Sequence, residues 1–111
     1  MKLETLESLK QRRSIRSYKP EQIKDEELNL VLEAGMYAPT SMGKQSPKRV
    51  VVQDPETMHQ LSEMNRKIMG TDFDPFYGAP TVVIVFAESE ESPHIEDASL
   101  VMANLMLGAY A

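Results

Sequence analysis

The chain has 111 residues, of which 41% are hydrophobic and 26% are charged, a composition typical of one globular domain. It contains no cysteine, which excludes disulfides, thiolate metal sites and a cysteine nucleophile, and its two histidines are too few for a zinc site. The formal net charge of −5 argues against nucleic acid as the main partner. We therefore expect residues 1–111 to form a single soluble domain without a metal site.

The charges are distributed unevenly along the chain. Residues 1–24 carry seven basic and three acidic side chains, whereas residues 88–97 carry five acidic side chains and no basic one. A positive N-terminal segment on an acidic protein favours a small anion as ligand. The longest uncharged apolar stretch, residues 98–111, is shorter than the roughly 20 residues that span a bilayer. Since the opening residues also lack the apolar run of a signal peptide, we predict a cytoplasmic protein with no membrane segment.

The first half of the chain alternates helices and loops. Leucines spaced three apart predict a helix over residues 3–11, and the pattern breaks over 12–20. Three acidic residues favour a helix start at Asp25, and apolar spacing continues the helix to about residue 37. Proline, threonine, serine and glycine then predict a loop over residues 38–47.

The second half begins with a β-branched run that predicts a strand over residues 49–53. Asp54 and Pro55 form a helix start, and this helix is expected to end near residue 68. A loop with aromatic anchors follows over residues 70–80. The continuous apolar run at 81–87 predicts a strand that is central and buried on both faces.

An acidic loop over residues 88–94 leads into a last helix that begins near residue 95. From residue 98 onward only Ser99, Asn104 and Gly108 are not apolar, so this helix should be covered on every side. Two strands and four helices are too few to cover it. We therefore expect a second chain over it, a longer domain of which this sequence is the front part, or both.

The basic segment that follows the first helix is a candidate anion site. In an extended chain Arg12, Ser14 and Arg16 point to one side, and Arg13 points to the other. Two guanidinium groups flanking a hydroxyl provide charged, two-point hydrogen bonds to a phosphate. The alternative is a solvated basic turn at a helix C-terminus, where the helix dipole favours cations.

Two further segments are candidates for binding. The loop over residues 38–47 offers backbone amides and small hydroxyls to a ligand, although it is equally typical of an ordinary connector. The group Asn65-Arg66-Lys67 near a helix end more often serves as a solvated surface. The chain has no G-x-G-x-x-G, P-loop, G-x-S-x-G or H-E-x-x-H motif, so we assign no catalytic residue. An enzymatic function would therefore depend on a cofactor.

Five short motifs occur in one order: Arg-Arg-Ser-Ile-Arg at 12–16, Asp-Glu-Glu-Leu at 25–28, Ala-Pro-Thr-Ser at 38–41, Gly-Ala-Pro at 78–80 and an apolar helix that begins at Asp97. This order resembles the N-terminal half of the nitroreductase family of FMN-dependent oxidoreductases. The resemblance implies an α+β fold, a mixed β-sheet flanked by helices, in an intertwined homodimer with FMN at the subunit interface. It also implies that the sequence stops after the start of the family's long central helix.

The resemblance also implies site residues. Arg12, Ser14 and Arg16 match the motif that holds the FMN phosphate and ribityl chain, with Arg13 between them. Residues 39–41 match the loop that lines the flavin from the partner subunit. The implied cofactor-binding residues are Arg12, Arg13, Ser14, Arg16, Pro39, Thr40, Ser41, Gln45 and Asn65.

The leading functional hypothesis is therefore an enzyme that passes hydride from NAD(P)H through FMN to a nitroaromatic, a quinone or a similar small acceptor. The second is a truncated, non-catalytic relative that serves as a dimerising or flavin-binding protein. The third is an acidic interaction domain without a ligand.

Overall fold

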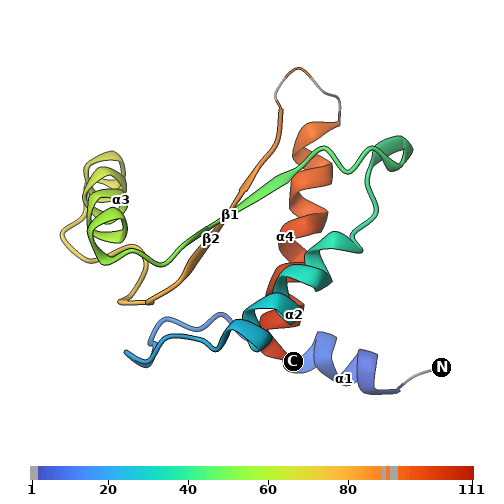
Figure 1. Cartoon of the computed structure of the whole chain (residues 1–111), viewed down its shortest axis with the longest axis horizontal. Helices are drawn as coiled ribbons and strands as arrows, with labels where there is room; N and C mark the ends of the chain where they lie inside the picture. Colours follow the sequence, from blue (N-terminus) through green and yellow to red (C-terminus); the bar gives the residue numbers. More distant parts are fainter. Residues whose placement is uncertain (1–2, 89, 91–92) are drawn as a thin grey trace. The chain divides into compact units, whose positions relative to one another are not determined.

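A computed structural model describes residues 3–88, 90 and 93–111 (Figure 1). The elements in chain order are α1 (Leu3–Gln11), α2 (Asp25–Met36), the 3-10 turn η1 (Ser41–Gly43), β1 (Lys48–Val52), α3 (Pro55–Met69), β2 (Val82–Phe86) and α4 (His94–Tyr110). The predicted order of helices and strands is confirmed, with strand limits within about one residue of those expected. Part of the predicted acidic loop, residues 89 and 91–92, lies outside the described residues.

Contacts within the chain define two compact units, which we describe separately. Unit 1 comprises Met1–Ser14, Lys24–Arg49 and Val85–Ala111, and unit 2 comprises Ile15–Ile23 and Val50–Ile84. The strands β1 and β2 pair in a two-stranded sheet.

The predicted burial of β2 on both faces is wrong. Its residues are half-buried and Phe86 is 53% exposed. A strand needs a neighbour on each side and layers on both faces to be fully buried. Among the described residues β2 pairs only with β1, so the apolar run gives a half-buried strand.

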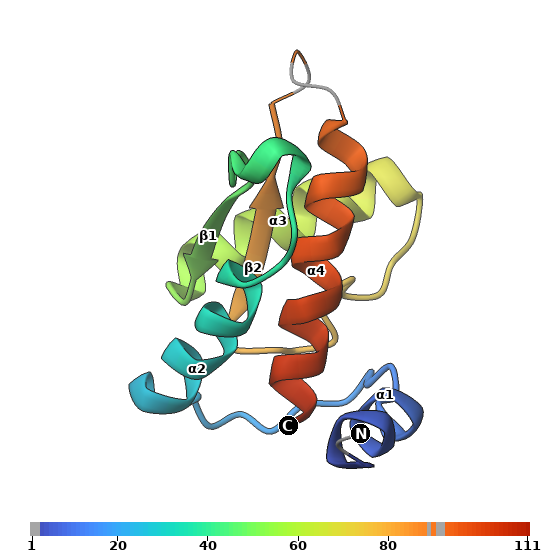
Figure 2. The same cartoon turned by 90° about the vertical axis from the view of Figure 1, so that its right-hand side faces the viewer.

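Unit 1 is built on α2 and α4, which lie side by side in both views (Figures 1 and 2). Among the residues that the structure describes, the buried apolar side chains all belong to this unit: Leu28, Ala38, Val101 and Leu105. Two glycines allow the helices to approach closely. A Cβ atom at Gly35 would lie 2.7 Å from Leu105 Cδ2, and one at Gly108 would lie 2.8 Å from the Cβ of Ala34.

The opposite side of α4 is not covered within the described residues, so the expectation of cover on every side is not met inside this chain. Ile95, Met102 and Met106 recur at helical spacing and are exposed, Ile95 by 65%. We call these three residues the outer face of α4. Leu3 and Leu9 of α1 are also exposed. No helix among the described residues is long and apolar enough to cross a membrane.

Unit 2 contains α3 and the loop that follows it. Asp54 caps α3, because its Oδ2 accepts hydrogen bonds from Thr57 N at 2.9 Å and from the Thr57 hydroxyl at 2.7 Å. Pro55 occupies the first helical turn, and Gly70 ends the helix with a φ of 67°. The predicted start of this helix and the loop over residues 70–80 are confirmed. Phe73 and Tyr77 of that loop are exposed, and their rings stack with centroids 5.8 Å apart.

Candidate cofactor site

The basic segment has no regular secondary structure, as expected, and its arginines differ in their contacts. Arg12 and Arg13 belong to unit 1, and Arg16 belongs to unit 2. Arg12 is half-buried just after α1, and its backbone N–H donates to Ser8 O at 3.1 Å. Neither the Arg12 nor the Arg16 guanidinium has a hydrogen-bond or ion-pair partner among residues 3–88, 90 and 93–111. Both are therefore available to an anion.

Arg13 is engaged differently. Its Nη1 donates hydrogen bonds to the carbonyl oxygens of Lys10 and Arg12, both at 2.8 Å. These carbonyls lie at the C-terminal end of α1, where the helix dipole favours a cation. Arg13 thus caps a helix, as the alternative interpretation of this segment describes, while its proposed position beside a phosphate stays a prediction.

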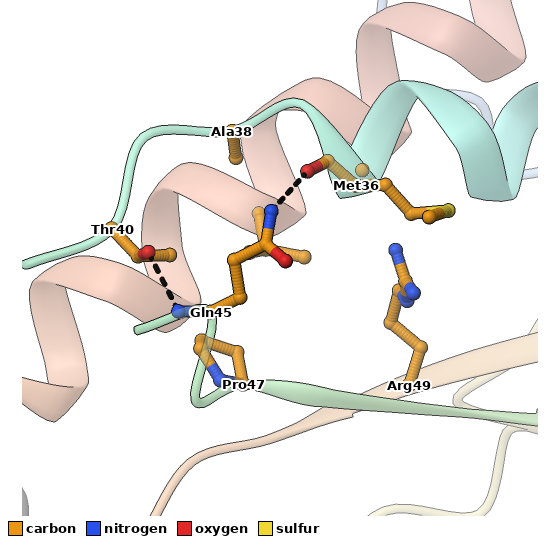
Figure 3. Close-up of a pocket in the computed structure, with 8 residues that line it drawn as sticks. Met36, Ala38, Thr40, Gln45, Pro47 and Arg49 are labelled. Atoms are coloured by element: carbon orange, nitrogen blue, oxygen red, sulfur yellow. Dashed lines mark hydrogen bonds between the residues drawn. The ribbon is translucent and has the colours of Figure 1, made fainter. Parts of the chain in front are cut away.

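Hydrogen bonds of two predicted site residues, Thr40 and Gln45, stabilise the loop over residues 38–47. Thr40 Oγ1 accepts a hydrogen bond from Gln45 N at 2.9 Å, and Gln45 Nε2 donates to Met36 O at 3.3 Å (Figure 3). Both residues border a cavity of about 40 Å³, lined also by Ala38, Pro47 and Arg49. That volume holds at most a few water molecules, at about 30 Å³ each in the liquid, so a flavin does not fit inside it.

Asp97 holds the same loop from a distant part of the chain. Its carboxylate is buried, with 6% exposure, and Oδ1 accepts a hydrogen bond from Ser41 N at 3.0 Å. The sequence pattern around Asp97 predicts only the start of an apolar helix. An acid in a first helical turn is explained equally well by the helix dipole, so the pattern carried no sign of this second role.

The C-terminal end of α2 is anchored by three side chains from elsewhere in unit 1. Arg49 Nη1 donates to Leu32 O at 3.1 Å, and Asn104 Nδ2 donates to Ala34 O at 3.0 Å. Gln45 supplies the third bond. Ala34 and Met36 are among the last four residues of α2, whose carbonyls have no i+4 partner within the helix, so the bonds to these two fix the point where the loop begins. Gln45 therefore has a structural role beside its predicted one.

Asn65 lies on α3 in unit 2, half-buried, and its side chain has no hydrogen-bond partner among the described residues. Its neighbour Arg66 pairs with Glu63 at 2.7 Å on the surface. Asn65 and Arg66 are both half-buried, and Asn65 differs in having no side-chain partner among the described residues.

A cavity of about 540 Å³ in unit 2 is within the usual size range of ligand pockets and lies between α3 and the loop of residues 74–80. None of the nine predicted site residues lines it. Its wall includes Asp74, whose carboxylate accepts hydrogen bonds from Ser62 Oγ, Phe76 N and Gly78 N. Burial raises the pKa of Asp74, but these bonds and the charge of Arg66 outweigh burial and lower it.

The described residues include no group of three or more histidine or carboxylate side chains placed to hold a metal ion. The predicted site residues belong to both units and carry hydrogen-bond donors: guanidinium groups, hydroxyls and amides. Groups of this kind bind anionic ligands.

Comparisons with known proteins identify the family. The family model described as the nitroreductase family matches residues 9–72. Two curated relatives are each described as a putative NADH dehydrogenase/NAD(P)H nitroreductase. The one from Methanothermobacter thermautotrophicus is 28% identical over 119 residues, which cover 99% of this chain and 57% of the relative. The one from Archaeoglobus fulgidus is 31% identical, with 96% of this chain and 61% of the relative covered. The chain thus spans about 60% of the length of these relatives.

Solved structures give the same result for the fold. A nitroreductase with bound FMN from Bacteroides fragilis superposes with a TM-score of 0.88 at 30% identity, over 96% of this chain and 64% of that protein. An FMN-dependent nitroreductase from Clostridium difficile gives a TM-score of 0.83 at 32% identity, over 95% and 54% of the two chains. The predicted α+β fold is therefore confirmed, and the chain belongs to the nitroreductase family.

Proposed function

We propose that the protein is a flavin-dependent oxidoreductase that passes hydride from NAD(P)H through FMN to a small acceptor such as a nitroaromatic or a quinone. The observation that carries the proposal is the likeness of nearly the whole chain to a nitroreductase solved with bound FMN. The names of the curated relatives point to the same donor and the same reaction class.

The residues present fit this cofactor. The guanidinium groups of Arg12 and Arg16, which have no partner in the part of the chain that the structure describes, would hold the phosphate by charged hydrogen bonds, together with the hydroxyl of Ser14. The side-chain amide of Asn65 would meet a polar edge of the flavin, and the loop of residues 39–45 would line it. When bound, FMN supplies the hydride transfer itself, so the protein needs none of the catalytic motifs that the sequence lacks.

The arginines provide the direct test. Replacing Arg12 or Arg16 by alanine should raise the dissociation constant for FMN by roughly 10- to 100-fold, because charged hydrogen bonds to the phosphate are lost. Lysine should restore only part of the affinity, since an ammonium group cannot make the planar two-point contact. Flavin fluorescence quenching during titration measures these constants.

Riboflavin and Arg13 supply the controls. Riboflavin has no phosphate, so its weaker binding should respond little to either substitution, and Arg13→Ala should change FMN binding least because its guanidinium already caps α1. Equal losses for FMN and riboflavin would contradict the phosphate role. Binding of FMN without oxidation of NAD(P)H would favour the non-catalytic alternative. A colourless protein whose melting temperature FMN does not change would favour the interaction domain.

We also propose that two copies of the chain associate through the outer face of α4. Ile95, Met102 and Met106 support this, since they are exposed apolar side chains at helical spacing on one side of α4. Met106→Glu should shift the protein to monomer in sedimentation velocity. Met64→Glu, at an exposed position on α3, is the matched control and should leave the association unchanged. A folded wild-type monomer at low micromolar concentration would contradict the proposal.

A further inference from the structure

We infer that Asp97 is a positioning residue, which holds the loop of residues 39–45 in the conformation that lines the flavin. The inference rests on the proposed function for the flavin part alone. The hydrogen bond between Asp97 Oδ1 and Ser41 N, 3.0 Å long, joins residues that are 56 positions apart. It is the direct link between α4 and the loop that was predicted to contact the cofactor.

The loop needs such a link because its backbone is locally unfavourable. Met42 and Gln45 have φ values of 54° and 51°, a region that side chains other than glycine rarely adopt. Met42 is also 88% exposed, so packing of its side chain does not repay this cost. Residues in such conformations persist where surrounding contacts determine them. Here those contacts are the hydrogen bonds that Gln45 donates to Thr40 and Met36 and the one that Ser41 N donates to Asp97.

Because Asp97 is buried, its hydrogen bond should stabilise one conformation of the loop over others. A carboxylate with 6% exposure has lost most of its contact with water and needs hydrogen-bond donors in its place. The Ser41 amide is one such donor, so displacement of the loop leaves a buried charge with a donor missing. The carboxylate therefore favours the one loop conformation in which Ser41 N points at it.

The helix that carries Asp97 is itself fixed. Asn104 of α4 donates to Ala34 O of α2, and the close approach at Gly35 and Gly108 leaves little room for α4 to slide. The loop begins at the end of α2. Both ends of the Asp97–Ser41 bond are thus attached to one packed pair of helices, so the loop is oriented relative to that pair.

The test compares Asp97→Ala with Glu96→Ala. Glu96 is exposed, lies in the same first turn of α4 and carries the same charge, which makes it a matched control. We expect Asp97→Ala to speed amide hydrogen exchange in residues 40–45 by about tenfold and to weaken FMN binding by a similar factor. Glu96→Ala should change neither. Asp97→Asn keeps an acceptor oxygen and should recover most of both effects.

A second variant approaches the bond from the loop. Ser41→Pro removes the donor, and the backbone accommodates proline because Thr40 before it is extended, with φ −130° and ψ 156°. After this change, Asp97→Ala should have little further effect on exchange in residues 43–45, since both substitutions break one bond. Independent, additive effects would overturn the inference.

Failure of the inference is distinguishable from failure of the proposed function. Unchanged exchange in Asp97→Ala overturns the inference whether or not FMN binds. If the wild-type protein does not bind FMN, the proposed function fails, and the flavin part of the inference fails with it. If exchange speeds up but FMN affinity stays the same, Asp97 holds the loop without positioning the cofactor, and the inference is overturned.

Discussion

The loops at residues 38–47 and 70–80 perform the same connection, from a helix to a strand, but they are fixed in different ways. Both contain residues with positive φ: Met42, Gly43 and Gln45 in the first, Gly70, Tyr77 and Gly78 in the second. The second loop is organised by Asp74, which bonds to Phe76, Gly78 and Ser62, at most 12 residues away. The first has local bonds of Gln45 to Thr40 and Met36 and, in addition, a bond from Ser41 to Asp97, which is 56 residues away.

The difference shows how each loop responds to changes elsewhere. A loop held by its own carboxylate needs only the adjacent turn of α3 to form. A loop bonded to Asp97 of α4 should change its conformation whenever the packing of α2 against α4 changes. The predicted cofactor residues Pro39, Thr40 and Ser41 lie in the dependent loop, so substitutions far from them in the sequence should alter binding.

The largest effect on this comparison should come from Gly108→Ala. The new Cβ would lie 2.8 Å from the Cβ of Ala34, which is fixed to the backbone of α2, so the helices must separate. Such overpacking costs about 1–3 kcal/mol, which exceeds the gain of up to about 1 kcal/mol from replacing glycine in a helix. We expect a lower free energy of unfolding in urea denaturation and faster exchange in residues 40–45. The loop at 70–80 should be unaffected.

The matched control exchanges glycine and alanine between positions 34 and 108. Ala34→Gly removes the opposing Cβ, so the double variant Ala34→Gly/Gly108→Ala should be more stable than the two single losses added together. Additive losses would show that the contact between these two positions is not the cause.

A smaller effect is expected from Asp74→Asn. The amide keeps one acceptor oxygen but turns an NH2 group toward backbone donors at Phe76 or Gly78. We expect a loss of about 1 kcal/mol in the free energy of unfolding. Asp72→Asn, the same change at an exposed position two residues earlier, should cost little. Exchange in residues 40–45 should stay at the wild-type rate, and an equal change in both loops would contradict their independence.

The pH dependence of the free energy of unfolding tests whether the ionised carboxylate of Asp74 is the source of this stabilisation. Its pKa in the folded protein is below the ordinary value of 3.8, so the unfolded chain takes up the proton first as the pH falls. The stabilisation is therefore fully present above the ordinary pKa and is lost as the pH falls toward the lowered one. The stability difference between wild type and Asp74→Asn should shrink between pH 6 and about pH 3. A constant difference would exclude the ionised carboxylate as its source.

The sequence predicted local features well. The start of α3 was recognisable because Asp54 and Pro55 act within one turn of the helix they begin. The end of α3 at Gly70 and the turn-rich segment after it are equally local. Basic residues after a helix commonly bond to its last carbonyls, so a cap in this segment could be expected. The pattern does not indicate that Arg13 is the arginine that makes these bonds.

Long-range features could not be predicted in the same way. Asp97 and Ser41 are joined only because α2 and α4 pack closely, and that packing depends on the volumes at Gly35 and Gly108. The burial of β2 was misjudged for a related reason, since an apolar run specifies a strand but not the number of its neighbours. The family resemblance implies that Thr40 and Gln45 are site residues. The hydrogen bond between them depends on the backbone conformation of the loop, which the sequence does not predict.

The division of unit 1 into three chain segments has a consequence for the order of folding. The bond from Ser62 to Asp74 closes a separation of 12 residues, whereas the bond from Asn104 to Ala34 closes one of 70. On the ribosome α2 emerges long before α4, with all of α3 and its loop made in between. The apolar side of α2 therefore stays uncovered until α4 is synthesised. During that interval the nascent chain is most prone to associate with other chains.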